Sequence, residues 1–188
     1  MHIRSTDYPA IQAMAKASRK AVTSSPLYGT RHSCIISVNV GIHVAAYFGL
    51  TIKPRAVQDR STNANWSVGS TGTGTVDARR HWDGHLIGTI EEQWIVDFAA
   101  DQRCRPEHEL IVNEPVVVPY NTEELNSTEG SHWLDPDTDV THTYRFLTGA
   151  DAGWRQAGDW QRKKPARALA ATAITALKHQ FTAQRWPT

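Results

Sequence analysis

Residues 33–48 read SCIISVNVGIHVAAYF, and this stretch decides how the chain is organised. Apolar side chains fall on nearly every side of a helix drawn through it, so such a helix would be buried all round. The β-branched residues also permit a strand, but the run of about 16 residues is longer than strands usually are. We therefore predict a buried helix that begins at His32 or Ser33 and ends at Gly49.

Outward from this helix, apolar periodicity predicts the other elements. Helical spacing indicates helices over residues 7–22 and 165–181, the first capped by Asp7. Strands are expected at residues 51–58, 84–90, 93–99, 114–120 and 140–147. Pro54 places the first of these strands near a sheet edge or a bulge.

Three polar segments complete the chain, at residues 59–83, 121–139 and 149–164. We predict a long mobile loop for the first, a polar insertion for the second and a loop for the third. The order of helices, then an antiparallel sheet, then a C-terminal helix predicts one α+β domain over residues 1–188.

Composition narrows the class of protein. The chain has 188 residues, 40% of them hydrophobic, and a formal net charge of +1. This balance is typical of a soluble globular domain and gives no reason to expect a nucleic-acid or membrane partner. The N-terminus lacks an apolar signal core, so a cytoplasmic location is expected. Cys34 and Cys104 are too few for a disulfide framework and are expected to be thiols.

Cys34 lies at the first turn of the predicted buried helix. A cysteine attacks a carbonyl carbon as thiolate, and both a helix N-terminus and a nearby imidazolium favour that form. The unpaired backbone N–H groups of the first turn can also hold a developing oxyanion. Cys34 is therefore a candidate nucleophile, provided that the fold brings a histidine to it.

His85 and Asp97 supply the missing imidazole and carboxylate. They lie in the two predicted strands of one hairpin, and Glu91 is midway between them. A turn centred on Glu91 makes His85 and Asp97 direct cross-strand neighbours on one face. Ile87 would share that face, whereas Trp94 and Val96 would point the other way. Asp97 would then accept the ring N–H and orient the imidazole toward a thiol.

Other interpretations compete with this one. A cysteine near a helix start, taken alone, is more often inert packing, and a lone strand histidine is usually structural. Cys104 and His108 have the spacing of two zinc ligands, but two convincing partners are missing, so no metal site is expected. The joint occurrence of Cys34, His85 and Asp97 favours the thiol site.

Three motifs resemble a family. They are YFGLTIKPRAV at residues 47–57 after the Cys34 helix, WDGHLI at 82–87 and QWIVD at 93–97. Together with Ser33-Cys34 they resemble the transglutaminase-like cysteine enzymes, a papain-like group that includes arylamine N-acetyltransferases and bacterial transglutaminase-like peptidases. The resemblance covers about residues 30–102. It implies a papain-like core with Cys34 as nucleophile, His85 as base and Asp97 as the orienting acid.

The resemblance implies acyl transfer from an amide or ester carbonyl through a thioester on Cys34, with no metal or organic cofactor. The Arg-Gly-Gly-x-Cys approach typical of the acetyltransferases is absent, which disfavours acetyl-CoA. We expect a peptidase or amidase acting on a protein, peptide or small amide. A transamidase and a non-catalytic module that keeps the fold are the alternatives. Tyr28 is a candidate oxyanion donor, and Trp66 and Trp82 are candidates to line the substrate cleft.

Overall fold

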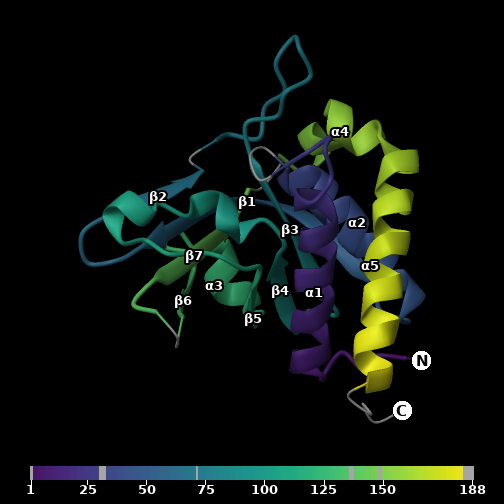
Figure 1. The fold of residues 1–188 in the computed structure, drawn as a ribbon. Coiled ribbons are helices and arrows are strands. Elements are labelled where there is room, and N and C mark those ends of the chain that lie inside the picture. Colours follow the sequence, from purple (N-terminus) through teal and green to yellow (C-terminus); the bar gives the residue numbers. More distant parts are fainter. Residues whose placement is uncertain (1, 30–32, 71, 136–137, 148–149, 184–188) are drawn as a thin grey trace.

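A computed structural model describes residues 2–29, 33–70, 72–135, 138–147 and 150–183. Over these residues the chain is an α+β protein with one antiparallel sheet and a C-terminal helix, as predicted (Figure 1). The paired strands follow the order β5-β4-β3-β1-β7-β6, and β2 also pairs with β1. The strands are β1 (Ile52–Thr62), β2 (Ser67–Ser70), β3 (His85–Ile90), β4 (Trp94–Asp97), β5 (Val116–Pro119), β6 (Ser131–Leu134) and β7 (Thr141–Phe146).

Three long helices pack together on one side of the sheet (Figure 1). They are α1 (Tyr8–Thr23), α2 (Cys34–Tyr47) and α5 (Lys163–Ala183). The shorter helices are α3 (Thr122–Asn126) and α4 (Gly158–Gln161), with 3-10 turns η1 (Ala100–Arg103), η2 (Pro106–His108) and η3 (Ala150–Gln156). The predicted N-cap of α1 is confirmed, since the Asp7 side chain accepts a hydrogen bond from the N–H of Ala10 at 3.2 Å.

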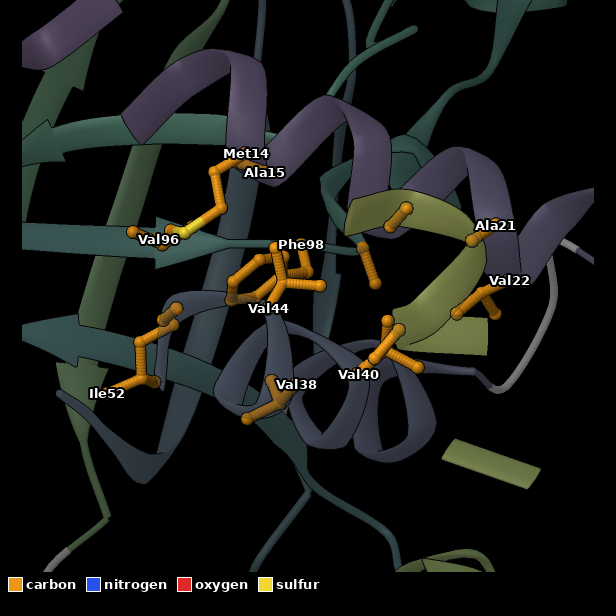
Figure 2. Packing of buried hydrophobic residues seen from close by; sticks show 14 of the residues in the cluster. Met14, Ala15, Ala21, Val22, Val38, Val40, Val44, Ile52, Val96 and Phe98 are labelled. Atoms are coloured by element: carbon orange, nitrogen blue, oxygen red, sulfur yellow. The ribbon is translucent and has the colours of Figure 1, made fainter. Parts of the chain in front are cut away.

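The helix that the opening stretch predicts is present and buried. In α2, Ile36, Val38, Val40 and Val44 are fully buried, and the left-handed backbone of Gly49 (φ +85°) follows its end. The ring of Phe98 lies against Gly41, where a Cβ atom would come within 2.3 Å of it. Figure 2 shows Phe98 among the side chains of α1 and α2 in this core. Because neighbouring elements cover most sides of this helix, apolar residues are favoured on most of its surface, and its sequence shows no single apolar stripe.

The two faces of the sheet carry separate apolar clusters. Leu86, Ile90 and Val96 face the long helices. Val57, Ile87 and Ile95 point to the opposite face and pack with β5, β7 and α3, where Leu125 completes the cluster. Trp94 also packs on the helix side, so the predicted alternation within the hairpin is confirmed.

Two of the three polar segments contain strands. Residues 59–62 continue β1, residues 67–70 form β2, and the polar insertion at 121–139 contains α3 and β6. The segment 149–164, predicted as a loop, contains η3 and α4. The prediction of a loop from residue 59 onward was wrong because the inward positions of β1 beyond Val57 are the polar Asp59 and Ser61, which break the apolar alternation. Both are buried and bonded to other buried polar groups.

Pro54 does not place β1 at the edge of the sheet, because β1 pairs with both β3 and β7. However, the pairing with β7 begins only at Val57, and Pro54 is paired with Gly88 of β3 alone. The missing N–H of proline therefore falls where one side of the strand lacks a neighbouring strand. Among the helices described here, none is both long enough and apolar enough to cross a lipid bilayer.

Candidate active site

Cys34 is the first residue of α2 and is 8% exposed. Its position is fixed from α1 by a buried arginine. Arg19 makes a two-pronged ion pair with Asp101 of η1, at 2.8 and 3.0 Å. Its remaining Nη1 donates to the hydroxyls of Ser33 (2.6 Å) and Ser37 (2.9 Å), on either side of Cys34. The start of α2 is thus held from outside the helix, because the Ser33 side chain makes no cap bond of its own.

The hairpin of β3 and β4 brings His85 to Asp97, but in a register different from the predicted one. Ile90 pairs with Trp94, so the turn is centred on Glu92 rather than on Glu91. Glu91 and Glu92 both have left-handed backbone, as a type I′ turn requires (φ +46° and +54°). The shift moves the pairing by two residues, which keeps His85 and Asp97 on one face as diagonal neighbours.

The His85 ring lies between Cys34 and Asp97. Its Nε2 donates to Asp97 Oδ1 at 2.8 Å, and the Cys34 side chain is near enough to the ring to contribute to the raised pKa of His85. Since Asp97 takes Nε2, the ring nitrogen left for the sulfur is Nδ1. The structure therefore brings the three predicted residues together in the order thiol, imidazole, carboxylate.

Asp97 is fully buried, and each of its oxygens accepts two hydrogen bonds. Oδ1 accepts from His85 and from the N–H of Ala99 (3.1 Å), and Oδ2 accepts from Arg103 Nη1 (2.7 Å) and the Tyr144 hydroxyl (3.1 Å). Burial alone would raise the pKa of Asp97, but the charges of His85 and Arg103 hold it well below its usual range. The carboxylate is therefore ionised and fixed in orientation.

Arg103 is the centre of a buried polar cluster that continues beyond Asp97. Its Nη1 also donates to Asp59, its Nη2 donates to the Tyr144 hydroxyl at 3.1 Å, and its Nε donates to Ser61 at 2.6 Å. The Ser61 hydroxyl lies 2.8 Å from Nδ1 of His142. We call this set the Arg103 cluster; its members are Asp59, Ser61, Asp97, Arg103, His142 and Tyr144.

The charges around His85 favour its imidazolium form. Burial alone would lower the pKa of His85, but the carboxylates of Asp59 and Asp97 outweigh it and raise the pKa well above its ordinary value. The hydrogen bonds with Asp97 and Cys34 act in the same direction. A cation beside a sulfur atom at a helix N-terminus is the environment that stabilises a thiolate.

The other candidate residues are distributed differently. Tyr28 and Trp82 pack against the apolar cluster that contains Cys34, and within the described residues the Tyr28 hydroxyl and the Trp82 N–H are buried without a hydrogen-bond partner. The Trp82 ring also covers Gly84, next to His85. Trp66, by contrast, is stacked on His108 at 3.6 Å, beside the β1–β2 turn. The roles of Tyr28 and Trp82 stay predictions, and nothing in these contacts joins Trp66 to the site.

Sequence analysis missed Asp59, Arg103 and Tyr144. Asp59 falls in the segment predicted as a loop, and neither Arg103 nor Tyr144 belongs to a motif. One signal was available: Val57, Asp59 and Ser61 alternate with exposed or half-buried residues, so they continue the inward face of β1. The partner that makes an inward carboxylate tolerable, Arg103, is 44 residues away from Asp59 and cannot be found by local pattern.

The site is nearly closed, since Cys34 is 8% and His85 is 5% exposed. An open groove of about 740 Å³ lies elsewhere, along β1, β2, β6 and β7. Its lining includes Asp59, together with Gln58, Arg60 and Arg145, but not Cys34, His85 or Asp97. The groove therefore does not expose the Cys34 sulfur.

Comparisons with known proteins do not assign the chain to a family. No family model matches it, and no curated protein matches it. A solved structure described as "The crystal structure of genomics APC5867" is similar, with a TM-score of 0.45 and 14% sequence identity. The match covers 92% of this chain and 79% of that chain. A similarity at this level supports no statement about function, which is therefore argued from the site alone.

Proposed function

We propose that this chain is a transglutaminase-like cysteine enzyme with a papain-like core, which transfers the acyl group of an amide or ester through a thioester on Cys34. The observation that carries the proposal is the His85 ring, which contacts Cys34 on one side and donates to Asp97 on the other. This order of sulfur, ring and carboxylate is the one that nucleophilic catalysis by a thiol requires.

The residues have distinct roles in this mechanism. The Cys34 thiolate attacks the carbonyl carbon, and the backbone N–H groups of the first turn of α2 stabilise the oxyanion. His85 gives its proton to the leaving group as the tetrahedral intermediate collapses to a thioester. His85 then takes a proton from the incoming acceptor, whose oxygen or nitrogen attacks the thioester and releases Cys34. Asp97 keeps the ring oriented throughout.

Water as acceptor gives a peptidase or amidase, which we favour, and an amine gives a transamidase. A protein, a peptide or a small amide are the substrates to be tested. The alternative of a non-catalytic module has one observation in its favour, the low exposure of Cys34. The hypothesis of a non-catalytic module predicts that this buried thiol is also unreactive. The two hypotheses therefore differ in the expected rate of alkylation of Cys34.

Alkylation with iodoacetamide between pH 5 and 9 separates them, followed by mass spectrometry of each cysteine. Cys104 is an internal control because it is a free thiol and more exposed than Cys34. The enzyme predicts faster labelling of Cys34 than of Cys104 at pH 6, despite its lower exposure. It further predicts that His85→Gln removes this advantage, whereas the matched His142→Gln keeps it. Slow labelling of Cys34 that is indifferent to His85 would leave the module as the better hypothesis.

A further inference from the structure

Asp59 is a second buried carboxylate at the candidate site. It comes from β1, is 5% exposed and lies on the same face of the sheet as Val57, which pairs with His85. The side-chain ligand atoms of Asp59, His85 and Asp97 all lie within 4.8 Å of one another. Asp59 is therefore close enough to His85 to affect its protonation directly.

One imidazole and two carboxylates at this spacing would suit a bound metal cation. In this protein, however, the cation between the two carboxylates is the guanidinium group of Arg103. Arg103 Nη1 donates to both Asp59 and Asp97, and its side chain is as buried as theirs. The space between the two carboxylates is thus taken by a guanidinium group, and the three residues form a closed arrangement of fixed charges.

The second carboxylate, Asp59, compensates for an effect of Arg103 on the charge of Asp97. A guanidinium that clamps Asp97 fixes its orientation, but it also cancels the negative charge that Asp97 presents to His85. The ionisable groups around the ring are Cys34 from α2, Asp97 from β4, Asp59 from β1 and Arg103 from η1, with His142 and Tyr144 of β7 behind them. Two carboxylates against one guanidinium leave one net negative charge beneath His85.

We propose that Asp59 is a positioning residue of this site: it neutralises Arg103, so that Arg103 can clamp Asp97 without removing the negative charge that favours the His85 imidazolium. The inference rests on the proposed function, because only a thiol enzyme needs that imidazolium. The pKa of His85 agrees with it: against the lowering effect of burial, the charge of Asp59 raises this pKa at least as strongly as the charge of Asp97, which also acts through its hydrogen bond.

The test is an NMR titration of the His85 ring in the full-length chain carrying Cys34→Ala, which removes coupling to the thiol. Asp59→Asn keeps the shape and one acceptor but not the charge. It should lower the titration midpoint of His85 by about one pH unit or more. The double variant Asp59→Asn with Arg103→Met restores one net negative charge, and its midpoint should return most of the way to that of the parent.

The double variant distinguishes charge from packing. If Asp59 were merely structural, removing Arg103 as well would break more hydrogen bonds, and the midpoint would not return. An unchanged midpoint in Asp59→Asn, or a double variant as low as the single one, overturns the proposal. Should Asp59→Asn fail to fold, the double variant, which leaves no unpaired buried charge, is compared with the parent directly. A midpoint lower by one pH unit or more would then overturn it.

Failure of this inference can be told apart from failure of the proposed function. The titration reports on His85 in a chain that lacks Cys34, so it does not depend on whether Cys34 is reactive. Sluggish labelling of Cys34 in the alkylation experiment refutes the enzyme whatever the titration gives. Selective labelling combined with an unmoved His85 midpoint refutes only the role of Asp59.

Discussion

Two buried histidines lie at opposite ends of the Arg103 cluster: His142 on β7 is a member of the cluster, and His85 on β3 is bonded to its Asp97. They are similarly enclosed, at 5% and 1% exposure. Nevertheless their pKa values move in opposite directions. Burial and the charge of Arg103 lower the pKa of His142 to about 4, whereas the carboxylates of Asp59 and Asp97 overcome burial and raise that of His85.

Burial lowers the pKa of both rings, so the opposite direction of the two pKa values comes from their neighbours. His85 donates directly to a carboxylate. Nδ1 of His142 instead meets the hydroxyl of Ser61, which itself accepts from Arg103. Arg103 therefore divides the cluster into an acidic side toward His85 and a basic side toward His142. Both rings lie on the same face of the sheet, yet only the one beside Cys34 has a raised pKa.

The largest effect is expected from removing Arg103. Arg103→Met leaves Asp59 and Asp97 buried side by side without their cation, which should lower the free energy of unfolding by about 3–5 kcal/mol. It also removes a positive charge that, together with burial, lowers the pKa of His142, so the pKa of His142 should rise. Urea unfolding measures the first effect, and an NMR titration of His142 measures the second.

Arg60→Met is the matched control for this variant. Arg60 follows Asp59 on β1 but is exposed, so its loss should change stability by no more than about 0.5 kcal/mol. If Arg103→Met cost less than about 1 kcal/mol, the guanidinium would not be the group that makes the two buried carboxylates tolerable.

The pH dependence of stability should reveal the opposite signs of the two histidines. Between pH 4 and 6.5 the unfolded chain protonates His142 but the folded chain does not, so the free energy of unfolding rises with pH, by up to about 3 kcal/mol. His85 acts conversely. Its contribution is complete below its unfolded value near 6.5 and is lost as the pH rises through its raised folded pKa.

Urea unfolding between pH 4 and 9 checks both limbs, with each variant compared to the parent so that other titrating groups cancel. His142→Gln should flatten the rise on the acid side, and His85→Gln should flatten the fall on the alkaline side. If His142→Gln changed the alkaline fall instead, or His85→Gln the acid rise, the directions of the two pKa shifts would be reversed.

Much of the fold could be predicted from sequence because its strongest signals are local. The apolar run before Gly49 predicted α2, and the hairpin followed from two short apolar runs around Glu91 and Glu92. The candidate site was partly predictable, since Cys34, His85 and Asp97 each belong to one of these elements. The exact turn was not, because the left-handed positions of a hairpin turn are normally marked by Asn-Gly or Asp-Gly, and Glu91 and Glu92 carry no such signal.

The charged half of the site could not be predicted for a different reason. Asp59 and Ser61 occupy inward positions of β1, and polar residues there are normally evidence against a buried strand. They are tolerated because Arg103 donates hydrogen bonds to both of them and Tyr144 pairs with Asp59 on the neighbouring strand. Arg103 and Tyr144 belong to segments more than 40 residues later in the chain. A single sequence contains no record of such long-range partners.

The smallest effect concerns the Tyr144 hydroxyl, which donates to Asp97 and accepts from Arg103. Tyr144→Phe keeps the ring in its apolar cluster, so only hydrogen bonds to charged groups are lost, at a cost of about 1–2 kcal/mol in urea unfolding. Tyr47→Phe, at a half-exposed ring, is the control and should be nearly neutral. Because the hydroxyl donates on the acidic side of the cluster, its loss should move the titration of His85 more than that of His142. Equal movement of both would show that the cluster responds as a single unit, and the division that Arg103 makes between its two sides would have to be abandoned.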